Sequence, residues 1–495
     1  MSERDESMPE RDPMSDPDEQ AFGEDEPSFG PEGLELGPDT PEFGPEATEE
    51  DREEADRVYE ELLERLGEGS PQPRLEPVRR AVELLGDPHR AHAVIHVTGT
   101  NGKTSTSRMI ESLLRAHGLR TGLLTSPHLV RFNERILIDG EPISDERLVA
   151  NWNDIQPYLR MVDDALEKEG EPRLTFFEAI VILAFAAFAD APVDVAVVEV
   201  GMGGEWDATN VVESQVAVFT PIALDHQSRL GNTVEEIART KSGIIKPLSQ
   251  VVSAAQVPEV VGELGRAAEL TESSLTVEGP GFSVSTAPGV GGQLVTIRGR
   301  AGEYREVFLP LYGEHQAHNA ALAVAAVESF LGGGTSRLEP DLVAEGLGSA
   351  TSPGRLQLVG VEPSVLVDAA HNPHGAQSLA AALSTYFSFS PVVAVVGTLE
   401  DKDAEGMLRA LEPVVDEFVV TTAPSERALD ADDLAAIAVK VAGADRVRVE
   451  PSVGAAIDAA RDQASEQENG AVVVFGSITL VGRVLEIAAD ENWKP

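Results

Sequence analysis

The chain has 495 residues, 42% of them apolar, and this length predicts two or three globular domains with substantial cores. It contains no cysteine, which excludes disulfides, thiolate zinc sites and cysteine nucleophiles, so that any metal must be held by oxygen or imidazole ligands. Its formal net charge of −47 argues against nucleic-acid partners, because binding to phosphates requires an excess of basic residues.

Nothing in the sequence indicates a membrane segment or a secretion signal. The longest apolar run, Ala179 to Ala189, is shorter than the ~18 residues that a membrane span needs. The N-terminus has no apolar stretch of the signal-peptide type. We therefore expect a cytoplasmic protein without a membrane partner.

The beginning of the chain has the composition of a solvated tail. Residues 1–50 are rich in Pro, Gly, Asp and Glu, with 18 acidic and two basic residues. Such a segment cannot bury enough apolar area to offset its chain entropy, so we expect a disordered acidic tail over residues 1–50. From Asp51 onward, the apolar spacing predicts two amphipathic helices, over residues 58–66 and 78–85.

Strand-like apolar runs then alternate with helix-length segments. The runs at residues 93–97, 193–200 and 216–219 predict a mostly parallel α/β sheet. Residues 282–310 alternate between apolar and polar residues around Gly-rich turns, which predicts a small antiparallel patch. After Ser352-Pro353-Gly354 a second α/β series begins. Its predicted strands are residues 365–368, 392–397, 417–422 and 471–475.

The strongest local signal is Val94-Ile-His-Val-Thr-Gly99-Thr100-Asn101-Gly102-Lys103-Thr104-Ser105, an apolar strand that leads through a Gly-rich turn into a helix. Glycines let backbone N–H groups close on phosphate oxygens, the lysine meets the terminal phosphates, and a following hydroxyl can hold Mg²⁺. The alternative is a glycine turn with an incidental lysine. We expect an α/β fold: an N-terminal P-loop ATPase domain over residues 51–350, and a smaller Rossmann-like α/β domain over residues 351–495.

Two further predicted strands end in side chains that can bind metal, namely Glu199 and the pair Asp225-His226. Ligands of open α/β sheets sit at the C-terminal edge of the strands, beside the phosphate loop. Taken alone, each of these residues is more often a capping or turn residue. Farther along, Lys241 and Lys246 lie near the end of a predicted helix, where positive charge is favourable in any case.

A dozen motifs follow one another in order between about Arg74 and Gly482. They are Ile95-His-Val-Thr-Gly-Thr-Asn-Gly-Lys, Thr125-Ser126-Pro127-His128-Leu129, Phe132-Asn-Glu-Arg135-Ile, Thr175-Phe176-Phe177-Glu178, Glu199-Val-Gly-Met-Gly-Gly, Asp207-Ala-Thr-Asn210, Leu224-Asp225-His226, Lys241-Ser-Gly-Ile-Ile-Lys-Pro, Gly313-Glu-His315-Gln316-Ala-His-Asn319, Pro353-Gly-Arg355, Asp368-Ala-Ala-His371-Asn372-Pro373 and Gly476-Ser477-Ile-Thr-Leu-Val-Gly482. Together they resemble the folylpolyglutamate synthase and dihydrofolate synthase family of the Mur-type ligases.

The resemblance implies an ATP-dependent amide ligase that acts in two steps. A folate or pterin carboxylate attacks the γ-phosphate to give an acyl phosphate, and the amine of L-glutamate then displaces phosphate. Such phosphoryl transfer needs positioning and charge neutralisation more than covalent help. The acceptor would be tetrahydrofolate, dihydropteroate or both, and the resemblance favours a monomer.

The resemblance also assigns the catalytic residues and the ions. Lys103 would neutralise charge between the β- and γ-phosphates. Thr104 or Ser105, with Ser126 and Glu199, would hold a first Mg²⁺. His226 would hold a second Mg²⁺, together with Lys241 carbamylated by CO₂, and K⁺ is a further candidate ion.

The remaining assignments concern the substrates. For ATP they are Gly99, Thr100, Asn101, Gly102, Lys103, Thr104, Ser105, Asn319, Arg355, Asp368 and His371. For folate and glutamate they are Ser126, Pro127, His128, Arg135, Phe176, His371 and Ser477.

Four positions depart from the family pattern. Thr104 stands where these enzymes often have Gly, Glu205-Trp206 replaces an Arg and an apolar residue, and Ala369 replaces a Gly. Two competing functions stay open. One is another Mur-type ligase acting on a cell-wall nucleotide precursor, and the other is a nucleotide-binding regulator that no longer turns over.

Overall fold

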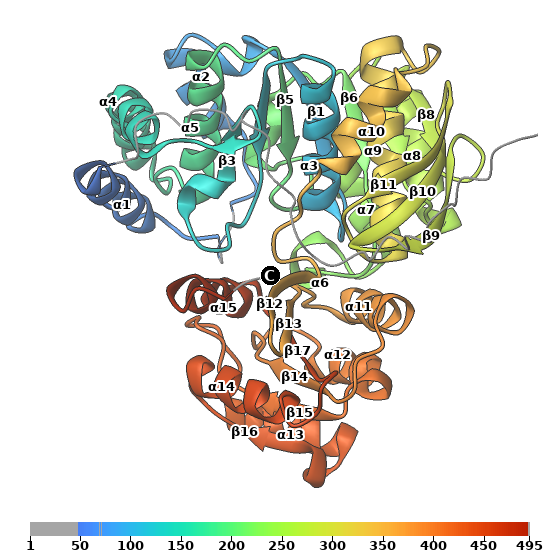
Figure 1. The fold of residues 1–495 in the computed structure, drawn as a ribbon. Helices are drawn as coiled ribbons and strands as arrows, with labels where there is room; N and C mark the ends of the chain where they lie inside the picture. Colours follow the sequence, from blue (N-terminus) through green and yellow to red (C-terminus); the bar gives the residue numbers. More distant parts are fainter. Residues whose placement is uncertain (1–47, 69, 71, 494–495) are drawn as a thin grey trace, which may run out of the picture. The chain divides into compact units, whose positions relative to one another are not determined.

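Three β-sheets organise the part of the chain that the computed structural model describes, residues 48–68, 70 and 72–493 (Figure 1). Residues 1–47 of the predicted acidic tail lie outside the described residues. Its last residues already belong to helix α1 (Glu49–Leu63), which Thr48 caps by accepting a hydrogen bond from the Asp51 N–H at 3.1 Å.

The largest sheet has eight strands in the order β4-β3-β2-β5-β1-β6-β7-β8. It is parallel from β2 to β8, and β3 and β4 add an antiparallel edge. The strands predicted at 93–97, 193–200 and 216–219 are β1, β5 and β6, and the other five were not predicted. Their bounds are β1 (Ala93–Thr98), β2 (Thr121–Leu124), β3 (Ile136–Ile138), β4 (Glu141–Pro142), β5 (Val195–Glu199), β6 (Val216–Phe219), β7 (Gln250–Ser253) and β8 (Ser274–Val277).

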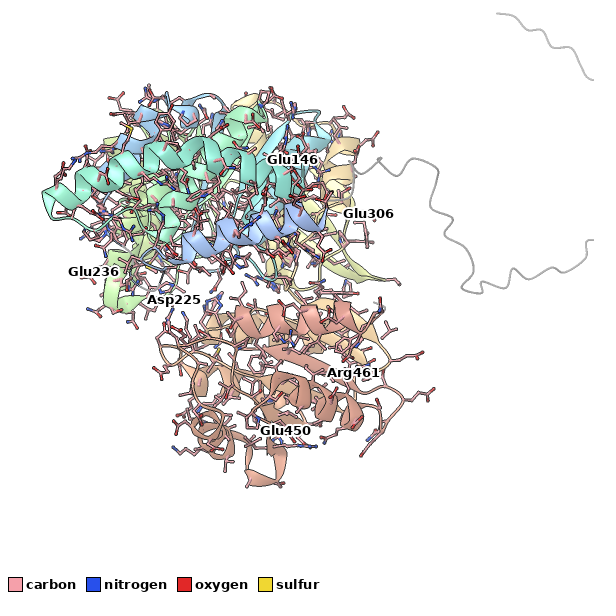
Figure 2. All side chains as sticks on the ribbon, turned by 90° about the vertical axis from the view of Figure 1, so that its left-hand side faces the viewer. Glu146, Asp225, Glu236, Glu306, Glu450 and Arg461 are labelled. Atoms are coloured by element: carbon pink, nitrogen blue, oxygen red, sulfur yellow. The ribbon has the colours of Figure 1, made fainter. Side chains whose placement is uncertain are left out.

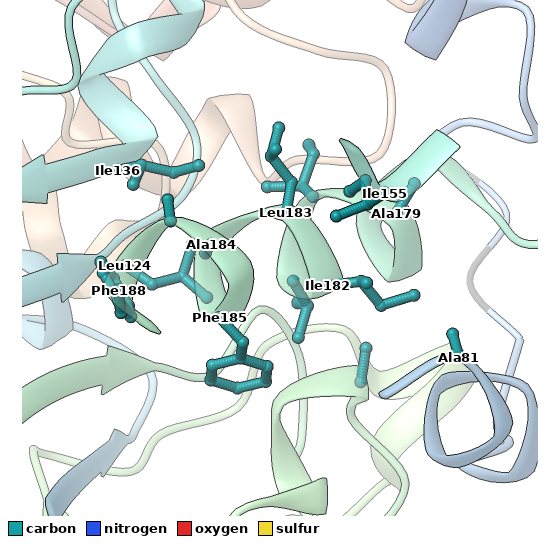
Figure 3. Packing of buried hydrophobic residues seen from close by; sticks show 14 of the residues in the cluster. Ala81, Leu124, Ile136, Ile155, Ala179, Ile182, Leu183, Ala184, Phe185 and Phe188 are labelled. Carbon is teal, nitrogen blue, oxygen red and sulfur yellow. The ribbon is translucent and has the colours of Figure 1, made fainter. Parts of the chain in front are cut away.

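Both faces of this sheet are buried, as expected for parallel strands with helical crossovers. Alternate residues of one strand belong to different clusters: Val94 packs with α5, whereas Ile95 packs with α3 and α9. Figure 3 shows Ile182 and Phe185 of α5 among the buried side chains of the first cluster. The helices around this sheet are α2 (Glu76–Leu84), α3 (Lys103–Ala116), α4 (Asp145–Glu169), α5 (Phe176–Asp190), α6 (Gln227–Leu230), α7 (Val234–Ser242), α8 (Pro258–Leu270), α9 (Glu314–Gly332) and α10 (Pro340–Gly348).

The predicted antiparallel patch forms a separate three-stranded sheet in the order β11-β10-β9. Its inward residues, such as Val295 and Ile297, join the cluster of α3 and α9, so the patch covers that side of the molecule. The strands are β9 (Ser283–Gly289), β10 (Gly292–Arg298) and β11 (Glu303–Leu309).

The third sheet has six strands in the order β12-β13-β17-β14-β15-β16 and begins after the linker at Pro353-Gly354. Only β12 is antiparallel. Four of its strands were predicted, whereas the edge strands β12 and β16 were not. The elements are β12 (Gln357–Val361), β13 (Ser364–Val367), α11 (Pro373–Tyr386), β14 (Val392–Val396), α12 (Ala404–Leu411), β15 (Glu417–Val420), α13 (Ala431–Ala442), β16 (Val447–Val449), α14 (Val453–Ala464), β17 (Ala471–Phe475) and α15 (Ile478–Asp490).

These sheets agree with the predicted α/β class, including the parallel main sheet, the antiparallel patch and the second, smaller α/β unit. The limits 51–350 and 351–495 stay a prediction. Over the described ranges, no helix has both the length and the apolar character that crossing a bilayer requires. Short 3₁₀ helices lie at Pro88–Arg90, Phe132–Arg135, Ala208–Val211, Glu412–Val414 and Ala444–Arg446.

Candidate active site

A cavity of about 1520 Å³ lies at the C-terminal ends of strands from both the eight-stranded and the six-stranded sheet. It brings together most of the residues predicted from the sequence, although these are scattered over almost 380 positions of the chain. Three predicted substrate residues, His128, Arg135 and Phe176, do not line it. The predicted residues that line it are Gly99, Thr100, Asn101, Gly102, Lys103, Thr104, Ser105, Ser126, Pro127, Glu199, His226, Lys241, Asn319, Arg355, Asp368, His371 and Ser477.

The phosphate loop connects the end of β1 to the start of α3. Gly99 and Gly102 have φ values of +148° and +86°, a region that other residues rarely adopt. A Cβ on Gly99 would lie 1.9 Å from Thr220 Oγ1, and one on Gly102 would lie 2.8 Å from Asn319 Oδ1, so both positions require glycine. No side chain caps the N-terminus of α3. Its first N–H groups are therefore available to an anion.

Glu199 ends β5 next to this loop, where the parallel register places it beside Val97. The side chain is buried. Oε1 accepts a hydrogen bond from Thr104 Oγ1 at 3.0 Å, while Oε2 has no partner among the described residues. Burial raises the pKa of Glu199 to about 7, against the opposing effects of Lys103 and Thr104. A buried carboxylate with one free oxygen beside a phosphate loop is suited to bind a cation.

The structure distinguishes the two candidate hydroxyls of the loop. Thr104 contacts Glu199, whereas Ser105 is buried and its hydroxyl faces other partners. Its Oγ lies 2.8 Å from Ser352 Oγ and accepts a hydrogen bond from Gln316 Nε2 at 3.3 Å. Thr104 is therefore the hydroxyl placed to share an ion with Glu199. Within the described residues, no group of three or more His, Asp or Glu side chains forms a metal site alone.

Lys241 lies in the last turn of α7 and is buried against the same loop. Its Nζ donates a hydrogen bond to the carbonyl oxygen of Gly99 at 2.7 Å. Burial lowers the pKa of Lys241 to about 7, and Lys103 acts in the same direction. The amine is therefore partly neutral near neutral pH, and a neutral amine is the form that acts as a nucleophile.

Asp225, labelled in Figure 2, connects segments that follow strands of the two large sheets. Its Oδ1 lies 3.3 Å from Lys402 Nζ, and its Oδ2 lies 4.0 Å from Nε2 of both His226 and His371. Burial opposes ionisation of this carboxyl, but His226, Lys402 and His371 hold its pKa at about 2. Burial lowers the pKa of both histidines to about 4, so both are neutral at pH 7.

Lys402 was not predicted from the sequence. It lies in the loop that follows β14, at the C-terminal edge of the small sheet. A lysine in the loop that follows a buried parallel strand is a weak signal that was available, because ligands bind at this edge.

The linker residues are braced by Asp368. Its Oδ2 accepts the N–H of Leu356 and its Oδ1 accepts the N–H of Ala370, both at 2.8 Å. Burial raises the pKa of Asp368, and Arg355 opposes the shift. Ala369, which replaces a family Gly, is not among the residues with positive φ, so alanine fits there without strain.

A further bridge joins the phosphate loop to the residues after β13. The side chain of Asn101 lies 3.0 Å from His374 Nδ1 and accepts a hydrogen bond from Asn372 Nδ2 at 3.1 Å. Asn319 Nδ2 donates to Gln316 Oε1 at 3.1 Å beneath Gly102.

The loop over residues 125–135, here called the Ser126 loop, is held from within by Glu134. This carboxylate accepts the N–H groups of Leu129 and Arg131 at 2.7 Å and of Val130 at 3.0 Å. Ser126 and Pro127 reach the cavity from one end of the loop.

The other end of the Ser126 loop does not line the cavity. Arg135 is buried, forms two hydrogen bonds with Glu68 at 2.8 and 3.1 Å, and donates from Nε to His128 Nδ1 at 2.9 Å. Its guanidinium carbon lies 5.3 Å from the ring centre of Phe176. These three residues shape the loop, and a direct contact with substrate stays a prediction.

The glycine loop after β5, residues 200–207, forms another wall. A Cβ on Gly201 would lie 2.6 Å from the Phe177 ring, and Trp206 and Asp207 also line the cavity. Glu205, the unusual acidic residue, is exposed and does not line it, so the charge reversal lies outside the cavity wall.

A buried hydrogen-bond chain anchors the glycine loop to β1. Thr209 donates from Oγ1 to Asp207 Oδ1 at 2.5 Å, and His96 Nε2 lies 2.9 Å from the same hydroxyl. Asp207 also accepts the N–H of Met202 at 2.9 Å. His96 is fully buried, and burial lowers its pKa to about 3.

Comparison with known proteins assigns this arrangement to a class. Residues 97–327 match the Mur ligase middle domain, and residues 354–478 match the glutamate ligase domain of the Mur ligases. The fold and the site thus define a Mur-type ligase, an ATP-dependent enzyme.

The relatives narrow the class to one family. A Mycobacterium tuberculosis protein named dihydrofolate synthase/folylpolyglutamate synthase is 45% identical over 438 residues, which are 83% of this chain and 90% of the relative. A structure of Mycobacterium tuberculosis folylpolyglutamate synthase complexed with ADP has 42% identity and a TM-score of 0.84, covering 88% of this chain and 99% of that one. Escherichia coli FolC in complex with DHPP and ADP has 31% identity and a TM-score of 0.77, covering 88% and 98%. The chain belongs to the dihydrofolate synthase/folylpolyglutamate synthase family, which confirms the resemblance and the predicted enzyme class.

Proposed function

We propose that the chain joins L-glutamate to folates in an ATP-dependent reaction that proceeds through an acyl phosphate. Tetrahydrofolate carrying its glutamate is one acceptor and dihydropteroate is the other, because the relatives bear both enzyme names. One observation carries the proposal. Glu199 has a buried oxygen without a partner beside the phosphate loop, and residues that follow strands of the small sheet line the same cavity.

The donor set beside Glu199 fits Mg²⁺, which prefers hard oxygen ligands together with substrate phosphates. Thr104, Ser126 and Glu199 would hold this ion, which supplies charge neutralisation at the phosphates. Lys103 at the start of α3 neutralises charge that develops between the β- and γ-phosphates. Asn319 and Arg355 bind ATP from α9 and from the linker.

Lys241 and His226 would serve a second Mg²⁺. The depressed pKa of Lys241 supports its carbamylation, because the neutral amine reacts with CO₂ and the product is an anion. An anion there removes the repulsion between a lysine cation and a metal ion. K⁺ stays a candidate third ion.

Residues around the small sheet would bind the amino acid substrate. Asp368 fixes the linker, and His371 and Ser477 line the cavity where L-glutamate would enter. Lys402 adds a positive charge at the same wall. We further propose that the enzyme acts in the cytoplasm as a monomer, with small molecules as its partners and no nucleic acid or membrane.

Phosphate release from ATP and Mg²⁺ with L-glutamate tests the proposal, with dihydropteroate and tetrahydrofolate compared as acceptors. Release with both indicates a bifunctional enzyme. Release with only one acceptor restricts the chain to the corresponding activity. Tight ATP binding without release in any mixture would contradict the proposal and favour a regulator.

A further inference from the structure

Two loops at the C-terminal edge of the small sheet are joined into one rim of the cavity. Residues 398–403 follow β14, and residues 425–429 precede α13. The N–H of Glu400 donates to the carbonyl of Arg427 at 2.9 Å, and Leu399 forms an antiparallel bridge with Ala428. We call this pair of segments the small-sheet rim. Its backbone bonds fix Arg427 relative to the loop that carries Lys402.

The small-sheet rim presents two cations to the cavity. Both Lys402 and Arg427 line it, and they differ in environment. The Lys402 side chain is 10% exposed and paired with Asp225, whereas the Arg427 side chain is 55% exposed. Arg427 Nη2 donates to Asp401 Oδ1 at 2.7 Å, and no other hydrogen bond of this guanidinium is recorded within the described residues. Since a guanidinium has five N–H donors, Arg427 retains donors for a ligand.

The proposed reaction requires positive charge at this wall. The incoming amino acid must direct its amine toward the acyl phosphate, while its two carboxylates need partners elsewhere. Lys402 is a compact charge that already faces Asp225. Arg427 is a planar fork that matches the two oxygens of a carboxylate. Lys402 and Arg427 are the only lysine and the only arginine of the small-sheet rim, all of whose residues are described.

We propose that Arg427 binds the side-chain carboxylate of the incoming L-glutamate and thereby selects dicarboxylic amino acids over their amides. This inference rests on the proposed function and adds a specificity-determining residue to it. Asp401 holds the guanidinium in place before the amino acid arrives, through the 2.7 Å contact.

Arg427→Gln tests the inference in the full-length chain. We expect the KM for L-glutamate to rise by about 10- to 100-fold, the range for loss of a charged hydrogen-bonded pair. The KM values for ATP and for the folate acceptor should stay unchanged. The preference for L-glutamate over L-glutamine, measured as a ratio of kcat/KM values, should fall by a similar factor. The KM for L-glutamate of Arg427→Lys should lie between the values of the unaltered chain and of Arg427→Gln, because lysine keeps the positive charge but lacks the planar, two-pronged guanidinium.

Arg409→Gln is the matched control. Arg409 is also an exposed arginine of the small-sheet region, paired with Glu405 at 2.6 Å, but it lies on α12 and does not line the cavity. We expect normal KM values for this variant. Both variants should melt within a few degrees of the unaltered chain, because each side chain is more than half exposed.

The outcomes separate the inference from the proposed function. If the unaltered chain turns over and Arg427→Gln shows the same KM for L-glutamate, or loses affinity for all three substrates alike, the inference is wrong and the proposed function stands. If the unaltered chain releases no phosphate with L-glutamate and either acceptor, the proposed function fails and the inference fails with it.

Discussion

The substitution Gly482→Ala tests whether the contact between α15 and the Ser126 loop positions the two sides of the cavity. A Cβ on Gly482 would lie 2.1 Å from the Leu129 carbonyl oxygen and 3.0 Å from its carbon. The closest ordinary C···O approach is ~3.3 Å, so the new methyl group is about 1.2 Å too close. The obstacle is backbone that Glu134 holds through three hydrogen bonds, and it cannot rotate away as a side chain could.

The expected loss follows from this displacement. Ser126 lies at one end of the loop and Ser477 directly precedes α15, and both line the cavity. A shift of about 1 Å between groups that must act together costs roughly 100-fold in rate. Overpacking costs about 1–3 kcal/mol, and exchanging a helical glycine for alanine returns about 1 kcal/mol. We therefore expect a folded protein with slightly lowered stability and strongly reduced turnover.

Phosphate release and thermal melting, measured on the same preparations, provide the assay. Gly454→Ala in α14 is the control, because the nearest atom to its Cβ is Ser452 Oγ at 3.9 Å. This variant makes the same exchange in a helix without a clash, so it should melt at the same or a higher temperature and keep its activity. Normal kcat and KM values for Gly482→Ala would refute the reasoning.

The remaining predictions concern the ion site, the lysine and pH. Glu199→Gln should reduce phosphate release by roughly 100-fold or more while leaving the melting temperature equal or higher, because the amide replaces a buried carboxylate that has one unpartnered oxygen; normal release would show that Glu199 holds no essential ion. Thr104→Ala should raise the Mg²⁺ concentration for half-maximal turnover by roughly tenfold, whereas Ser105→Ala should leave it unchanged and lower the melting temperature; the reverse order would contradict the assignment. Lys241→Ala should lose most activity yet bind ATP, with partial rescue by short carboxylic acids, and wild-type activity would exclude the carbamate. His96 takes up its proton near pH 6.5 when unfolded but only near pH 3 when folded. The contribution of neutral His96 to the free energy of unfolding is therefore complete above pH 6.5 and is lost as the pH falls toward 3, by about 1.4 kcal/mol per pH unit. Denaturant unfolding at several pH values between 6.5 and 5 should show that the free energy of unfolding depends less steeply on pH in His96→Asn than in the unaltered chain. An equal dependence on pH would count against this prediction.

The strands that sequence patterns predicted are those with long apolar runs between recognisable turns. β5 is five consecutive buried residues, and a run of that kind is typical of a parallel strand covered on both faces. The missed strands β2 and β7 are as short as the predicted β6, but glycine or polar residues leave each of them only two consecutive apolar residues, so neither shows an apolar run. β2 pairs with β5, about 74 positions later, a contact that no local period reveals.

The candidate site also contains residues that local sequence patterns predicted and residues that only the fold brings together. The phosphate loop was predicted because strand, glycines, lysine and helix lie in one continuous segment. The sequence could not choose between Thr104 and Ser105, because adjacent residues on a helix point about 100° apart and only the position of β5 decides which one meets Glu199. Lys402 and Arg427 belong to no local motif, and only the folded small-sheet rim brings them to the cavity.

The hydrogen-bond chain from His96 to Asp207 has a fixed direction. The Thr209 hydroxyl gives its single proton to Asp207, so it can only accept from His96, which must carry its proton on Nε2. This leaves His96 Nδ1 as a bare acceptor without a described partner. A single tautomer is thereby imposed on a residue of the strand that ends in the phosphate loop. The tautomer of His96 therefore links the glycine loop to the strand that leads into the phosphate loop. Neither segment can shift along the sheet without breaking the hydrogen bonds between His96, Thr209 and Asp207.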